Sequence, residues 1–210
     1  MNNKFLPYIV STGVLLGLFI YASNLYFAHP TLNDASQAPA YHLKNVSHYL
    51  RSDEVQRSVF HLNKAIEKIE NIKRDANPES YAGLENAIDE LLDVNDQLCS
   101  DTVNLDEMYK AFEITLNHLA CTELEISEMY AEDDRQDLAT VALKYAQMHI
   151  RDALVFQQCI YDEDSEHMVL ERDVFRELDS LIANESVSAA EMTVKIDGIL
   201  KKVDYLIAME

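Results

Sequence analysis

The chain has 210 residues, a length that suits one ordinary domain plus a membrane segment. Four glycines and four prolines are too few for a turn-rich barrel or sandwich, and the abundant Ala, Leu, Glu, Lys and Asp favour helices. The formal net charge is −20, with Asp34 as the first acidic residue, so the charged part repels nucleic acid and anionic lipid. It suits basic partners or cations, although such a charge more commonly serves only to keep a domain soluble.

Residues 5–28 form an uncharged and mainly apolar stretch with tyrosines near both ends. About 20 helical residues cross the hydrocarbon core of a bilayer, so this stretch is predicted to be a transmembrane signal anchor. The alternative is a signal peptide cleaved after a small residue such as Ala22 or Ala28. Signal peptides usually have an apolar core of about 7–15 residues, so the length favours the anchor.

The orientation follows from the flanking positive charges. Lys4 precedes the segment, and the next Lys or Arg is Lys44. Residues 1–4 are therefore expected to be a cytoplasmic tail and the domain to lie outside the cytoplasm, or to be secreted if the segment is cleaved. Gly13 and Gly17 form a Gly-x-x-x-Gly pair that would allow a homodimer, although small residues are also common in membrane helices.

Residues 29–40 contain two prolines and several turn-forming side chains, a composition typical of a linker. From Tyr41 onward, apolar residues recur at helical spacing, so residues 41–210 are expected to form an acidic helical domain. A short first helix is expected over residues 41–51. Ser52 then either caps the next helix or marks a kink.

Later helix starts are predicted from capping sequences, in which a side-chain oxygen accepts from free N–H groups of the first turn. Short connections between the helices make neighbours antiparallel. The capping sequences are Asn77-Pro78 and the capping boxes Asn104/Glu107 and Ser188/Glu191.

Apolar stripes predict which face each helix buries. The longest runs from Leu105 to Met129 with the three-four rhythm of a bundle seam. Asn95 and Thr115 are polar residues on such stripes and are expected to fix helix register. The next helix is expected to bury Leu138, Val141, Tyr145, Met148, Val155, Phe156 and Cys159. The last two helices are expected to bury Leu170, Val174, Leu178 and Leu181, and Met192, Ile196, Ile199, Val203 and Leu206. The predicted fold is all-α: an up-and-down antiparallel bundle of about five to six helices, or three αα-hairpins, behind one transmembrane helix.

The sequence contains no Walker loop, dinucleotide-binding turn, nucleophile elbow or Cys-x-x-Cys pair, which predicts a protein without catalytic site or cofactor. Helices drawn as rods place His118 and Cys121 at the height of His149 and Asp152 on the returning helix. Such side chains can bind zinc or copper. Because they are more commonly hydrogen-bonded residues of a bundle, no metal site is predicted.

The same rod geometry places Cys99 and Cys159 at one level, with Cys121 about 24 Å up its helix. A disulfide between Cys99 and Cys159 is one hypothesis for an oxidising compartment, and three buried thiols are the alternative. Glu163 and His167, four residues apart, are expected to form a surface pair.

These patterns favour a membrane-anchored, extracytoplasmic interaction or scaffolding domain that binds an unidentified protein and no nucleic acid. The alternative is a ligand- or metal-binding sensor bundle, which would need a membrane partner because residues 1–4 are too short for an output domain. A hydrolase-like enzyme is disfavoured because no nucleophile and base converge.

Overall fold

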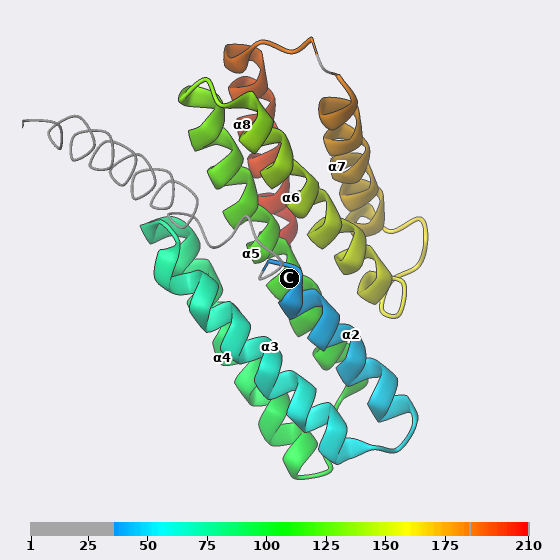
Figure 1. The fold of residues 1–210 in the computed structure, drawn as a ribbon. Helices are drawn as coiled ribbons and strands as arrows, with labels where there is room; N and C mark the ends of the chain where they lie inside the picture. The colour runs from blue at the N-terminus through cyan, green and yellow to red at the C-terminus, as the bar shows by residue number, and fades with distance from the viewer. Residues whose placement is uncertain (1–35, 185, 210) are drawn as a thin grey trace, which may run out of the picture.

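The computed structural model describes residues 36–184 and 186–209, and all the regular structure in these ranges is helical (Figure 1). None of these helices is long and apolar enough to cross a membrane. The predicted tail, transmembrane segment and glycine pair all precede residue 36, so they lie outside the described residues and stay predictions. The described helices are α2 (Ala38–Arg51), α3 (Val55–Asp75), α4 (Pro78–Cys99), α5 (Leu105–Glu132), α6 (Gln136–Gln157), α7 (Glu166–Ala183) and α8 (Ala189–Ala208).

The helices pack in chain order, each against the next, and α8 returns to pack on α5 (Figure 1). Short connections reverse the chain between neighbours, which confirms the all-α bundle. The described part of the chain has seven helices where five or six were expected. The difference arises because the short first piece is a complete helix of 14 residues.

Two apolar cores share the long helix α5. The first core holds side chains of α2, α3, α4, the first half of α5 and the end of α6. The second holds the other half of α5, the preceding part of α6, and α7 and α8. On α5 the boundary falls between Leu119 and Ala120. Because α5 and α6 contribute side chains to both cores, these two helices link them. The predicted faces of α7 and α8 are confirmed except at one position. Leu170 is partly buried against the second core, and the other predicted residues are all buried: Val174, Leu178, Leu181, Met192, Ile196, Ile199, Val203 and Leu206.

All three predicted helix starts are confirmed as N-caps, but the reciprocal bond of a capping box is not formed at Ser188, where Glu191 Oε1 pairs instead with Lys195 at 2.8 Å. Asn77 Oδ1 accepts from the first-turn N–H groups of α4, and Ser188 Oγ accepts from the N–H of Glu191. Asn104 also caps its helix, but its own N–H donates to Gln97 Oε1 at 3.2 Å instead of to Glu107. The capping box predicted there is therefore replaced by a bond between the ends of two helices.

The predicted boundaries around the first helix are wrong in two places. Helix α2 begins at Ala38, so the linker predicted to run to residue 40 ends earlier, and Pro39 lies in the first turn, where a missing N–H costs nothing. Ser52 is a C-cap whose Oγ donates to the carbonyl of His48 at 3.1 Å. Asp53, with φ of 60°, then reverses the chain before α3.

The buried face of α6 differs from the predicted one. Of the predicted residues only Phe156 is buried, whereas Val155 is 48% exposed and Cys159 lies at the surface. Alanines, which the apolar pattern underweights, make up much of the true face, because small side chains let α6 approach α5 closely. The true face carries Ala139, Ala142, Leu143, Ala146, His149, Ile150, Ala153, Phe156 and Gln157.

Candidate functional site

A second stripe of residues runs along α5 between α4 and α8. The residues at its two ends are exposed, whereas Ala111, Ile114 and Cys121 in its middle are buried at the bottom of two hollows. Its members recur at steps of four and three, so they share one side of the helix. Both α4 and α8 pack on α5 rather than on each other. The stripe consists of Glu107, Ala111, Ile114, His118, Cys121, Glu125, Glu128 and Glu132, and we call the depression above it the acidic groove.

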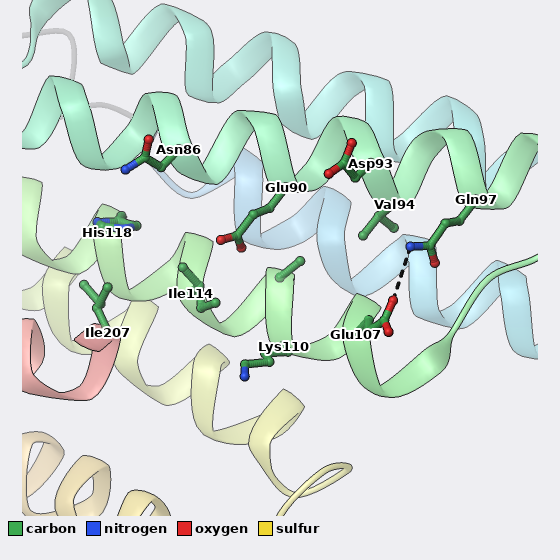
Figure 2. Close-up of a pocket in the computed structure, with 11 residues that line it drawn as sticks. Asn86, Glu90, Asp93, Val94, Gln97, Glu107, Lys110, Ile114, His118 and Ile207 are labelled. Atoms are coloured by element: carbon green, nitrogen blue, oxygen red, sulfur yellow. Dashed lines mark hydrogen bonds between the residues drawn. The ribbon is translucent and has the colours of Figure 1, made fainter. Parts of the chain in front are cut away.

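The acidic groove consists of two hollows that meet at His118, a residue that lines both. The first hollow has a volume of about 440 Å³ and lies between α4 and α5 (Figure 2). Ile207, from the end of α8, closes it on one side. At the far end, Gln97 Nε2 donates to Glu107 Oε2 at 3.3 Å (Figure 2). Its floor is apolar, and Glu90 reaches over that floor from α4 (Figure 2).

The second hollow has a volume of about 520 Å³ and is strongly acidic. It lies between the start of α4, the second half of α5 and α8, and its one lysine, Lys201, pairs with Asp197 at 2.6 Å. Six carboxylates line this hollow and three line the first, against one lysine in each. The carboxylates are Glu79, Glu90, Asp93, Glu107, Glu125, Glu128, Glu132, Asp197 and Asp204.

The electrostatics of the groove disfavour its own negative charge. Burial raises the pKa of Glu125, and although Ser80 and Asn77 donate hydrogen bonds to this carboxylate, the nearby acids oppose them. Burial likewise raises the pKa values of Glu128 and Asp204. A carboxyl group whose pKa is raised by burial is stabilised in its ionised form by an incoming cation, because opposite charge favours the carboxylate.

Gly83 of α4 makes room for the imidazole at the centre of the groove. A Cβ at Gly83 would lie 2.5 Å from His118 Nδ1, which is too close for any real contact. Glycine therefore lets the ring lie directly against α4 (Figure 2). Burial lowers the pKa of His118 to about 4, so the ring is neutral at pH 7 and adds no charge to the middle of the groove.

Cys121 joins α5 to α8 beneath the second hollow. Its Sγ donates to Asp204 Oδ1 at 3.7 Å. Burial raises the pKa of this thiol well above its usual value, with Asp204 adding to the effect, so the sulfur stays protonated at neutral pH. A protonated, buried thiol is a poor nucleophile and a poor metal ligand.

The four residues weighed as metal ligands are not brought together. His118 and Cys121 face the groove, whereas Asp152 bonds Lys44 of α2 at 2.6 Å and His149 is fully buried beside that pair. In residues 36–184 and 186–209, no three His, Cys, Asp or Glu side chains are arranged to hold a metal ion. Heights along rods can be read from sequence, but the rotation of each helix about its axis depends on its packing partners.

All three cysteines are free thiols, so the disulfide hypothesis for Cys99 and Cys159 is wrong for this structure. Both residues are exposed at the ends of their helices. Cys159 lies 3.8 Å from Arg51 Nη2 on the α2 side of the bundle, and α4 and α6 pack on α5 rather than on each other. The two cysteines lie at the ends of helices that are not neighbours. The level of a residue along the bundle does not determine which helices are adjacent.

The predicted surface pair of Glu163 and His167 is also wrong, because His167 is buried. Its Nε2 lies 2.7 Å from Oε1 of the buried Glu113, an atom that also accepts from Gln157 Nε2 at 2.7 Å. Tyr161 stacks on the imidazole with 4.9 Å between ring centroids. Sequence reasoning missed this buried cluster. Its one visible sign is Glu113, which interrupts the apolar part of α5, but its partners lie on other helices and could not be identified from spacing. This cluster joins α5, α6 and α7 and takes no part in the groove.

Comparison with protein-family models, curated proteins and solved structures gave no match. An apolar floor between acidic walls has the chemistry of a binding surface.

Proposed function

We propose that this protein is a non-enzymatic interaction domain, presented outside the cytoplasm by its N-terminal anchor, and that it binds a partner protein in the acidic groove. The observation that carries the proposal is the pair of adjoining hollows along α5. They follow one side of the helix between α4 and α8, with Ala111 and Ile114 buried at the bottom of the first and with carboxylates lining both.

The dimensions of the groove support a macromolecular partner. The stripe from Glu107 to Glu132 extends about 37 Å at 1.5 Å per residue. Its floor combines apolar side chains with polar walls, the arrangement of a protein interface with a hydrophobic centre and a charged rim.

A ligand-binding sensor bundle is the second candidate function. Each hollow taken alone, at about 440 or 520 Å³, falls in the range of small-molecule sites. A small ligand would occupy one hollow, whereas a protein partner would cover both. This difference defines the experiment.

A photo-crosslinking side chain is placed in the full-length protein at Asn86 in the first hollow or at Leu200 in the second. The control is Val194, which is 70% exposed on α8 and lines neither hollow. Irradiation of membranes from the source cells should give the same protein adduct at Asn86 and Leu200 and none at Val194. Adducts that form equally at Val194, or at none of the three positions, would contradict the proposal. A protein adduct at one hollow alone would also count against it.

A further inference from the structure

We infer that the groove accepts a cationic amphipathic helix of a partner protein, with its apolar stripe on α5 and its Lys or Arg side chains against the acidic walls. The inference rests on the proposed function and names the chemistry of the partner. It is carried by the spacing, polarity and charge of the residues that line the groove.

The spacing of the floor fits a helix. From Glu107 to Glu132 the steps are four, three, four, three, four, three and four. This is the rhythm with which one helix presents holes to the knobs of another. Helices α4 and α8 flank the stripe on either side. An added helix would therefore lie in a groove with helical walls, which is a common mode of peptide recognition.

The polarity of the floor requires an apolar stripe on the occupant. Ala111 and Ile114 line the first hollow with Val94 and Ile207, and the neutral ring of His118 follows them. A charged side chain laid on these residues would lose its water without gaining a partner. Leucine-like side chains would instead fill the hollow and remove their own apolar surface from water.

The walls require positive charge on the rest of the occupant. Nine carboxylates line the two hollows against two lysines, and Lys201 is already paired with Asp197. Lys and Arg side chains flanking an apolar stripe would reach these walls while their stems cover the apolar rim. The carboxylates of the second hollow, which burial has deprived of water, would then gain positively charged neighbours.

The charge also identifies which occupants do not fit. A second copy of a chain with net charge −20 would bring further negative charge into the groove. The apolar segment of this chain, residues 5–28, has no Lys or Arg to offer the walls. A basic segment of another protein is the occupant that satisfies both floor and walls.

The test measures binding of labelled synthetic peptides to the full-length protein in detergent by fluorescence anisotropy. The probe is a helix of about 25 residues with leucines at alternating steps of three and four and Lys or Arg at its other positions. One control peptide has the same composition with the leucine positions scrambled, and another has Glu in place of each basic residue. The basic helix should bind at least tenfold more tightly than the scrambled peptide, and the acidic helix should not bind.

Variants of the protein locate the binding to the groove. The double variant Glu128→Gln/Asp204→Asn should weaken binding of the basic helix about fivefold to tenfold. Asp173→Asn/Asp179→Asn removes the same charge from α7, away from the groove, and should leave the affinity within about twofold. Ile207→Arg, which places a cation at the apolar side of the first hollow, should weaken binding by more than tenfold.

The result that overturns the inference is equal binding of the basic helix and its scrambled form, or equal loss in the α7 variant and the groove variant. Tighter binding of the acidic helix overturns it as well. If these peptides fail while crosslinks at Asn86 and Leu200 persist, the groove is an interaction site for a different occupant and only the inference is wrong. If the crosslinks fail too, the proposed function is wrong with it.

Discussion

Glu123 shows at the scale of one residue how burial controls protonation in this domain. It lies on α5 with almost no exposed surface, and Ser36 Oγ donates to its Oε1 at 2.7 Å. Burial raises its pKa to about 8, and the hydrogen bond from Ser36 opposes this only in part. The side chain is therefore mostly a neutral carboxylic acid at pH 7. Glu171 behaves in the same way, since burial and the nearby Glu113 raise its pKa well above the usual value.

The raised pKa of Glu123 predicts how stability changes with pH. Below about pH 4.5 both folded and unfolded states hold the proton, and the contribution of Glu123 is fully present. Between there and the folded pKa of about 8, the unfolded chain releases its proton first, so stability falls as pH rises. Glu123→Gln keeps an acceptor for Ser36 and cannot ionise.

We expect the melting temperature of Glu123→Gln to equal that of the wild type near pH 4 and to exceed it increasingly up to about pH 8. The difference between the two proteins is the quantity to compare, because His118 and His149, with pKa values lowered to about 4, change stability in the opposite direction below pH 6.5. A constant difference across this range would show that Glu123 keeps an ordinary pKa.

The contact between Gly83 and His118 gives a second prediction at this scale. Gly83→Ala places a methyl group where the imidazole lies, so the ring has to swing out of its place against α4. Its pKa should then rise from about 4 toward the ordinary value of 6.5, because the ring regains water. NMR titration of the His118 ring measures this shift. An unchanged titration in Gly83→Ala would mean that the ring does not rest on the glycine.

At the scale of the helices, the packing of α6 depends on alanine. Ala139, Ala142, Ala146 and Ala153 lie on its buried face, and Ala146 is completely covered. Replacing such a residue with a larger one forces the two helices apart, since the interior has no room for extra methylene groups.

We predict that Ala146→Leu lowers the free energy of unfolding by about 1–3 kcal/mol in urea denaturation. The matched control is Val155→Ser on the same helix, at the position that the apolar pattern predicted to be buried and that is 48% exposed. Its effect should stay within about 0.5 kcal/mol. A larger loss of unfolding free energy in Val155→Ser than in Ala146→Leu would mean that α6 buries the face predicted from the sequence.

The buried threonine on the predicted stripe of α5 forms its hydrogen bond within its own helix rather than to a neighbouring one. Thr115 is buried, but its Oγ1 donates to the carbonyl of Ala111 at 2.7 Å, one turn earlier in the same helix. A hydroxyl that is satisfied within its own helix gives no preference for the register of another. Thr115 therefore forms no side-chain hydrogen bond to another helix, and Asn95 is half-buried, so the expected role of both residues in fixing register stays a prediction.

At the scale of the whole molecule, the two cores are coupled because α5 and α6 run through both. Leu119 is buried in the first core, and its neighbour Ala120 belongs to the second. Disruption at this junction should therefore reach all the helices rather than one end of the bundle.

We predict that Leu119→Asp unfolds or severely loosens the whole domain, because an unpaired buried carboxylate costs several kcal/mol, comparable to total stability. Amide hydrogen exchange measures the effect helix by helix. Protection should be lost together in α2–α3 and in α7–α8. Loss confined to α2–α4 and the adjoining half of α5 would mean that the two cores unfold independently.

The sequence alone determined the features that depend on short stretches of chain. Helical periodicity gave the all-α class, Asn77 and Ser188 marked helix starts through bonds to their own first turns, and the apolar stripes of α7 and α8 gave their buried faces. These features require only residues a few positions apart, so local spacing carries them.

Only the tertiary structure decided how each helix is rotated and which helices are neighbours. The face of α6, the burial of His167 against Glu113 and the separation of the candidate metal ligands all depend on residues far apart in the chain. The acidic groove depends on the same choice. Its stripe from Glu107 to Glu132 is visible in the sequence, but α5 carries a second stripe with the same rhythm. The energetics of packing α4, α6 and α8 around one helix determine which stripe packs fully in the cores and which lies below the two hollows.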